Sequence, residues 1–187
     1  MLWYTYIVDV GGCMKKIYII QMDTKTIPSK IVSLFTMSQY GHVAISFNKN
    51  CDYIYSFGRK NLYSIINGGF TMECKDGKFF KKFKNTKCRV YEIDVTKEQY
   101  NCLVKIIRYM KRHSDDYGYD YLGLILRYFK IPVTFKNKYV CSYFVAELLK
   151  EANIYEFDKE TFNVTPKDFD NINIFNLIYT GKYVMYR

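Results

Sequence analysis

A cysteine, Cys141, stands where the sequence changes from a short extended stretch to an amphipathic run. From this cysteine, apolar residues recur at offsets of three, four, seven and eight, which is the core stripe of an α-helix. They are Phe144, Val145, Leu148 and Leu149. The spacing predicts a helix with Cys141 in its first turn, where unpaired main-chain N–H groups and the helix dipole favour the nucleophilic thiolate. Taken alone, Cys141 is better explained as a small buried apolar residue, and only its combination with a candidate base favours the nucleophile.

A nucleophilic cysteine needs a base beside it, and the sequence holds two histidines. His113 ends a charged helical stretch and is well explained as a solvated residue at a helix C-terminus. His42 instead begins a run of β-branched and aromatic residues, so we expect it at the start of a strand. Alternation in that strand places His42, Ala44 and Ser46 on one face, which is smaller and more polar than the other. His42 is therefore the better candidate base, with a structural role as its alternative.

The elements that would position these two residues follow from periodicity and turn signals. We predict strands at 16–22, 40–48, 52–57 and 89–95, with the second and third joined as a hairpin. We predict helices at 29–35, 97–112, 119–129 and 141–150, and a short turn or helix from Thr165-Pro166. The second of these helices opens with a capping-box pattern, Thr96-Lys-Glu-Gln99, and the third is expected to turn Tyr121, Leu124 and Ile125 inward.

Two further hairpins are expected, one joining 70–73 to 79–83 around Asp76-Gly77 and one within 172–186 around Thr180-Gly181. Together these elements predict an α+β fold, with helices packed against a mostly antiparallel sheet. The chain is 187 residues long, with 49% hydrophobic and 25% charged residues. This indicates a single globular domain, 1–187, in which 1–13 is a disordered or additional extension. Both Met1 and Met14 remain open as translation starts.

Composition excludes several classes of function. The six cysteines form no CxxC pair and only two histidines are available, so we expect no metal site, no cofactor and free thiols in a reducing, cytoplasmic setting. No apolar run has the length of a transmembrane helix, about 20 residues. The net charge is +10, but the basic residues are scattered apart from the run 78–84. We therefore expect no nucleic-acid partner.

The order of these features resembles the circularly permuted papain-like fold of the NlpC type. That group includes YiiX-like hydrolases and lecithin–retinol acyltransferase-like enzymes, in which the histidine strand precedes the cysteine helix. The matching stretches are Tyr40-Gly-His-Val-Ala-Ile-Ser46, Tyr55-Ser-Phe-Gly-Arg59, Val140-Cys-Ser-Tyr-Phe-Val-Ala-Glu-Leu-Leu149 and Thr165-Pro166. They extend over most of the chain from about residue 16.

The resemblance implies that Cys141 is the nucleophile, His42 the base and the main-chain N–H of Cys141 an oxyanion donor. The family's third, polar residue falls nearest to Ser56, with Glu73 and Asp52 as alternatives. A serine can orient an imidazole, but it does not stabilise imidazolium as a carboxylate does.

We therefore expect a cysteine hydrolase (amidase or peptidase) or an acyltransferase that works through an acyl-enzyme. Its substrate would be a peptide-like amide or a lipid-type acyl group, with weak membrane-surface contact. The alternative is a non-catalytic binding module that retains the fold and holds a lipid or another anionic ligand.

Overall fold

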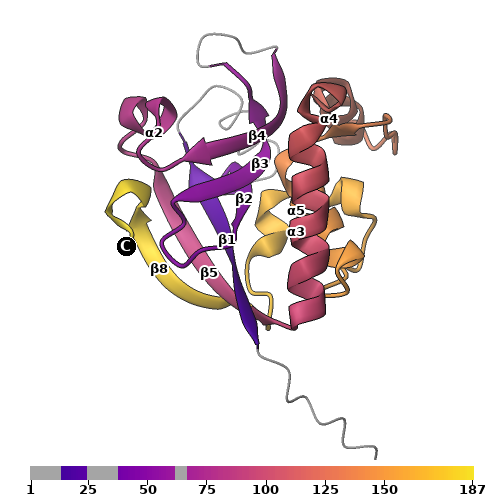
Figure 1. Cartoon of the computed structure of the whole chain (residues 1–187). Helices are drawn as coiled ribbons and strands as arrows, with labels where there is room; N and C mark the ends of the chain where they lie inside the picture. Colours follow the sequence, from indigo (N-terminus) through magenta and orange to yellow (C-terminus); the bar gives the residue numbers. More distant parts are fainter. Residues whose placement is uncertain (1–13, 25–37, 62–66) are drawn as a thin grey trace, which may run out of the picture.

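The computed structural model describes residues 14–24, 38–61 and 67–187. Six strands form one sheet in the order β4-β3-β2-β1-β5-β8, and each neighbouring pair is antiparallel. They are β1 (Lys15–Asp23), β2 (His42–Ser46), β3 (Tyr53–Arg59), β4 (Gly68–Cys74), β5 (Lys87–Val95) and β8 (Asn176–Lys182). Helices α3 (Lys97–Arg112) and α5 (Cys141–Glu151) lie on one side of this sheet (Figure 1). The chain is thus an α+β protein built on an antiparallel sheet.

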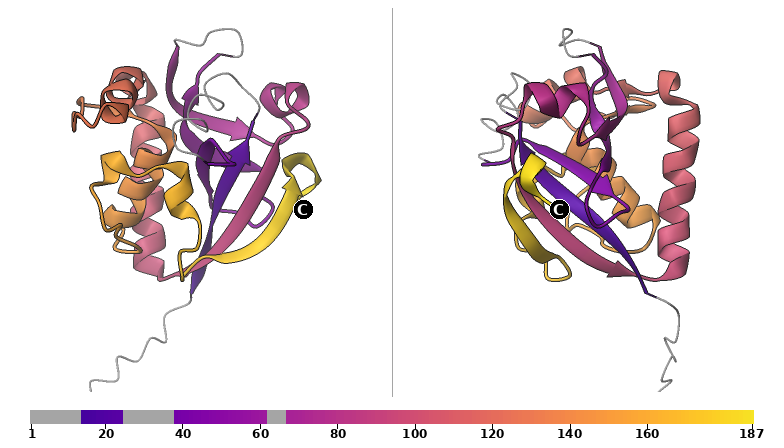
Figure 2. Two further views of the ribbon diagram at one scale, coloured as in Figure 1. Left: turned by 180° about the vertical axis from the view of Figure 1, so that it is seen from behind. Right: turned by 60° about the vertical axis from the view of Figure 1, so that its left-hand side comes forward.

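Each face of the sheet has its own apolar core. On one face, Val43 and Ile45 of β2 pack in a cluster with residues of α3 and α5, including Leu103 and Phe144. On the other face, Ala44 belongs to a second cluster. That cluster also includes Phe80 of the short helix α2 (Lys78–Lys82) and Tyr183 of the 3₁₀ turn η4 (Tyr183–Met185). Helices α3 and α5 and helix α2 therefore lie on opposite sides of the sheet, as the rotated views show (Figure 2).

The strand predictions at 16–22, 40–48, 52–57 and 89–95 are confirmed as β1, β2, β3 and β5. Strand β1 lies between β2 and β5 and is buried from Ile17 to Met22, which explains a sequence that is apolar apart from Gln21. The split of β2 residues between the two cores follows the predicted alternation of its side chains.

Local sequence signals fix the starts of α3 and α5. The predicted capping box is present: Gln99 N donates to Thr96 Oγ1 at 3.2 Å, and Thr96 N donates to Gln99 Oε1 at 2.9 Å. Helix α5 begins at Cys141 and buries its predicted stripe, Phe144, Val145, Leu148 and Leu149. Each fully buried side chain of this kind stabilises the fold by about 1.5–3 kcal/mol. These buried side chains therefore hold α5 against the sheet.

Two predicted hairpins are wrong. Residues 79–83 lie largely in helix α2, because Gly77 N–H bonds back to Cys74 O at 2.9 Å and Gly77 then caps the helix. Residues 172–186 contain a single strand, β8, which pairs along β5 and is followed by η4. Gly181 therefore lies opposite Cys88 within the ladder, and the Thr180-Gly181 signal does not mark a turn.

The segment between α3 and α5 contributes no strand to the six-stranded sheet. It contains η1 (Ser114–Asp116), β6 (Gly118–Tyr119), helix α4 (Tyr121–Tyr128) and β7 (Lys138–Tyr139). Strands β6 and β7 pair in parallel as a separate two-stranded sheet. Helix α4 was predicted two residues too long at its start, because Asp120 caps it through the Gly123 N–H at 3.0 Å. The prediction that Ile125 faces inward is wrong, since that side chain is 51% exposed.

After α5, two further 3₁₀ turns, η2 (Thr161–Asn163) and η3 (Pro166–Phe169), lead into β8. The second confirms the short element predicted from Thr165-Pro166, with Pro166 at its first position. The predicted helix at 29–35 and the predicted extension at 1–13 lie outside the described residues.

Candidate active site

The Cys141 thiol lies at the first residue of α5, held between that helix and β2. The preceding residue, Val140, is extended and serves as the helix N-cap. Ser142 fixes the first turn from outside the helix, because its Oγ donates to Val164 O at 2.6 Å. Cys141 is only 1% exposed. The predicted position at a helix start is therefore confirmed, in a setting more buried than a freely reactive thiol would have.

Two opposing influences act on this thiol. Burial raises the pKa of Cys141 to about 11, because a thiolate is poorly solvated there. The main-chain N–H groups of Val43, Ser142 and Cys141 itself act in the opposite direction by favouring the thiolate. Two of these groups belong to the start of α5, as expected from its unpaired N–H groups. The third belongs to β2, at the residue that follows His42.

His42 begins β2 and is only partly buried as a residue. Removal of its ring from water lowers the pKa of His42 to about 4, so the imidazole is neutral at pH 7. Its Cε1 lies 3.7 Å from the point where a Cβ on Gly58 would stand. Thus the ring extends toward β3, where Gly58 leaves room for it.

The structure brings Cys141 close to the strand that carries His42, but it does not join the two side chains by a hydrogen bond within the described residues. Strand alternation assigns His42 to the face of Ala44, whereas α5 packs on the face of Val43. At rest the candidate pair is therefore a neutral thiol and a neutral imidazole on opposite faces of β2.

The candidate third residues lie on β3 and β4. Ser56 is 2% exposed, and its Oγ donates to Val43 O at 2.6 Å, so this hydroxyl ties β3 to β2. Glu73 pairs with Ile54, four residues along β3 from Gly58, or about 13 Å. Burial raises the pKa of Glu73 to about 7, while Arg59 acts in the opposite direction. Ser56 is therefore the nearer of the two to the His42 ring.

The other sequence candidates lie elsewhere. Asp52 precedes β3 and accepts a hydrogen bond from Asn48 Nδ2 at 2.7 Å, so it belongs to the β2–β3 turn. His113 follows α3, where its Nδ1 lies 2.9 Å from Tyr109 O. This agrees with its interpretation as a residue of the helix C-terminus.

One neighbour of Cys141 was not predicted from the sequence. Tyr119 of β6 is close enough to Cys141 for a thiolate to raise its pKa further, although burial is the larger cause of that rise. Two half-buried tyrosines of the segment between α3 and α5, Tyr117 and Tyr139, pack their rings on Phe57. Periodicity could not reveal Tyr119, because β6 is only two residues long and is positioned by pairing with β7.

The described cysteines at positions 51, 74, 88, 102 and 141 are all free thiols. In the described ranges, no group of three His, Cys, Asp or Glu side chains could hold a metal ion. None of the described helices is both long and apolar enough to cross a membrane.

Comparison with known proteins adds no family to this geometry. No protein-family model matches the sequence, and no curated protein matches it either.

Proposed function

We propose that the chain is a cysteine-dependent acyl-transfer enzyme, a hydrolase or acyltransferase with the permuted papain-like fold of the NlpC type. One observation carries the proposal. The Cys141 thiol lies at a helix start, and the main-chain N–H of Val43, the neighbour of His42, lowers its pKa by favouring the thiolate. Thus three N–H groups favour the thiolate beside the strand that carries the better candidate base, an arrangement suited to a nucleophile and to the oxyanion it generates.

In the proposed reaction, the Cys141 sulfur forms a bond to the substrate carbonyl carbon while the thiol proton passes to His42. The N–H groups around the sulfur, including that of Cys141, stabilise the developing oxyanion. The imidazolium then gives its proton to the departing amine or alcohol, which leaves a thioester. Water or an acceptor amine resolves that thioester with His42 as base.

This sequence of steps begins from a neutral pair, in keeping with the opposite pKa shifts of Cys141 and His42. It also requires the His42 ring, which strand alternation assigns to the other face of β2, to turn toward the sulfur when substrate is bound. Catalytic hydrogen bonds are often long in free enzymes and tighten in the substrate complex. Ser56 is the favoured positioning residue, because it is tied to the main chain beside His42.

The second candidate function is a binding module without catalysis. It is favoured by the 1% exposure of Cys141 and by the rise of its pKa to about 11, since both suppress thiolate chemistry at pH 7.

The deciding experiment measures acylation of Cys141 by a series of 4-nitrophenyl acyl esters, using release of 4-nitrophenol and peptide mapping by mass spectrometry. We expect an acyl adduct at Cys141 that Cys141→Ala removes and that His42→Ala slows by about 100-fold or more. His113→Ala is the matched histidine control and should leave the rate unchanged, because that residue lies at the end of α3. Cys88→Ala is the matched thiol control, since burial raises the pKa of Cys88 to about 12.

The pH profile separates the two candidate functions. If neutral His42 is the base, the acylation rate rises as pH passes about 4 and is then level through neutral pH. If the thiol reacts without a base, the rate keeps rising tenfold per pH unit toward about 11, as the thiolate fraction grows. An adduct that is absent, or that forms equally fast in His42→Ala, would leave the binding module as the better account.

A further inference from the structure

Helix α4 exposes its apolar stripe instead of burying it. Leu122, Ile125 and Phe129 follow at offsets of three and seven and are 56%, 51% and 66% exposed. Helices of globular proteins normally turn such a stripe toward the core and leave polar residues outside. The inner side of α4 is instead occupied by Gly123, which is buried against Asp120. The exposed stripe therefore needs an explanation other than packing within the fold.

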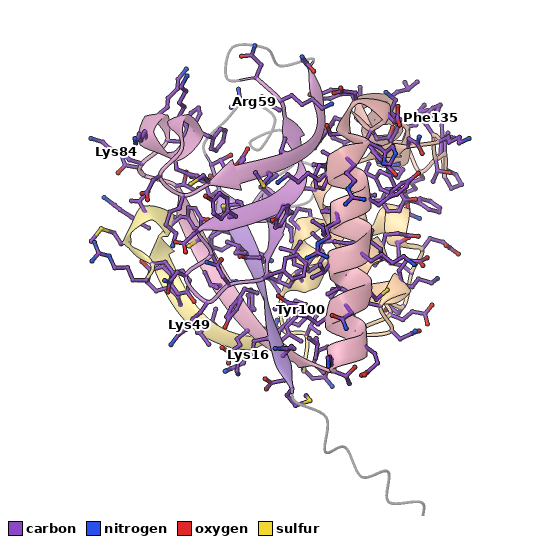
Figure 3. All side chains as sticks on the ribbon, viewed as in Figure 1. Lys16, Lys49, Arg59, Lys84, Tyr100 and Phe135 are labelled. Atoms are coloured by element: carbon purple, nitrogen blue, oxygen red, sulfur yellow. The ribbon has the colours of Figure 1, made fainter. Side chains whose placement is uncertain are left out.

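The apolar surface continues into the loop after α4. Ile131 and Phe135 are 45% and 37% exposed. We use the name apolar ridge for the exposed side chains of Leu122, Ile125, Phe129, Ile131 and Phe135. Phe135 lies at the outer side of the molecule beside α4, away from the sheet (Figure 3).

Buried polar contacts hold the segment that carries the apolar ridge in place. Asp120 and Arg127 form an ion pair of 2.8 Å whose side chains are 2% and 8% exposed. The same Arg127 donates to Val133 O at 3.1 Å, which links the helix to the loop that follows it. The exposed apolar side chains therefore belong to a helix and a loop that these contacts join to each other.

The exposed charges within the segment that carries the ridge have one sign. Lys130, Lys136 and Lys138 are exposed in the same segment, and no Asp or Glu occurs from Tyr121 through Ala146. Lysines flanking exposed apolar side chains are the pattern of interfacial helices that bind anionic lipid, because the apolar side chains enter the bilayer boundary while the ammonium groups meet headgroups. The complementary surface is apolar at its centre and negatively charged around it.

The shape of this region distinguishes among partners. Helix α4 and its loop project from the body of the protein beyond α3 (Figures 1 and 2). A projecting helix can lie in the plane of a membrane surface, whereas a partner protein that covered it would have to offer a groove of matching shape.

We propose that the apolar ridge docks this protein on an anionic lipid bilayer, with the apolar side chains inserted at the headgroup boundary and Lys130 and Lys136 on lipid phosphates. The proposal does not rest on the catalytic one. It would place the bilayer next to the segment that joins Tyr119 to Cys141, because α4 lies between them in the chain.

Vesicle flotation tests the proposal, using phosphatidylcholine vesicles with and without phosphatidylglycerol. The wild-type chain should float with the anionic vesicles, more weakly with the neutral ones, and less as salt is added. Ile125→Glu with Phe129→Glu should reduce the anionic partition coefficient by about tenfold or more, because two inserted side chains are lost. The matched control is Leu177→Glu with Met185→Glu, at positions that are 51% and 69% exposed elsewhere on the surface, and it should leave binding unchanged.

Charge is tested separately. Lys130→Ala and Lys136→Ala should each lower anionic-vesicle binding by about fivefold. Lys49→Ala and Lys84→Ala are the controls, since both lysines are exposed and lie on the other side of the view from Phe135 (Figure 3). Circular dichroism and thermal unfolding should be the same for all variants, because every substituted side chain is exposed.

Three outcomes would overturn the proposal: equal binding to neutral and anionic vesicles, equal loss in the ridge variant and the Leu177/Met185 control, or no vesicle binding. A wild-type dimer that Ile125→Glu with Phe129→Glu dissociates, without vesicle binding, would assign the ridge to a second copy of the chain. Cys141→Ala should float like the wild type whether or not the enzyme proposal holds, so the two proposals fail separately.

Discussion

Helices α3 and α4 carry the same kind of apolar spacing and use it in opposite ways. In α3, Leu103, Ile107 and Met110 are buried at 0%, 4% and 7% exposure. In α4, the corresponding stripe of Leu122, Ile125 and Phe129 is more than half exposed. Helix α3 packs on the sheet, whereas α4 is fixed at its ends by a buried ion pair and by β6 and β7. The comparison teaches that periodicity identifies a helix and its apolar side, while long-range contacts decide whether that side is covered.

The largest expected effect is on the support of α4. Asp120→Ala leaves the buried Arg127 charge without its partner and removes the cap on Gly123 N. Breaking one side of a buried pair costs about 3–5 kcal/mol. Native-state hydrogen exchange should show the α4 amides losing protection by that amount. Asp116→Ala, at an exposed acid in the preceding turn, is the control and should change little. Equal protection in both variants would mean that something other than the ion pair holds α4.

A core truncation in α3 comes next. Leu103→Ala removes a fully buried side chain, so the free energy of unfolding should fall by about 2–5 kcal/mol in urea titrations. Tyr109→Ala on the same helix is the control, because that side chain is 57% exposed and its loss should cost about 0.5 kcal/mol or less. Comparable losses in the two variants would contradict the assignment of a covered and an open side to α3.

The start of α3 should matter to a smaller degree. Thr96→Ala removes the acceptor for Gln99 N and leaves one helix N–H without its cap. The expected loss is about 1 kcal/mol in the free energy of unfolding. Thr134→Ala, an exposed threonine in the loop after α4, is the matched control and should be close to neutral. If both threonines behave alike, the capping box does not stabilise α3 in solution.

The smallest effect is expected on the open side of α4. Ile125→Ser should change the free energy of unfolding by about 0.5 kcal/mol or less, since the side chain is 51% exposed. A loss approaching that of Leu103→Ala would show that the stripe is covered in solution. The two helices would then differ less than their exposures indicate.

Most elements could be predicted because their signals are local. The capping box of Thr96 and Gln99 defined the start of α3, and the apolar stripe after Cys141 defined α5. Two predictions failed where distant parts of the chain decide. The second half of the proposed 172–186 hairpin has no partner strand of its own, because β8 pairs with β5. Ile125 was placed inward because its spacing cannot tell which side of α4 the sheet will meet.

The candidate site shows the same difference between local features, which could be predicted, and long-range contacts, which could not. The position of Cys141 at a helix start and of His42 at a strand start could be predicted from local patterns. The main-chain contact from Val43 and the approach of Tyr119 could not, because each joins segments that are far apart in sequence. The roles of Cys141, His42 and Ser56 in catalysis stay predictions, to be decided by the acylation experiment.

The two ends of the segment that contains α4 are hydrogen-bonded to each other. Gly118 N donates to Asn137 O and Asp120 N to Tyr139 O, both at 3.0 Å. A surface segment whose two ends are hydrogen-bonded to each other can change in sequence and length while its ends stay in place. Natural or engineered versions could therefore lengthen, shorten or replace residues 121–136 without moving Cys141. Specificity for a surface could in this way evolve independently of the chemistry beside it.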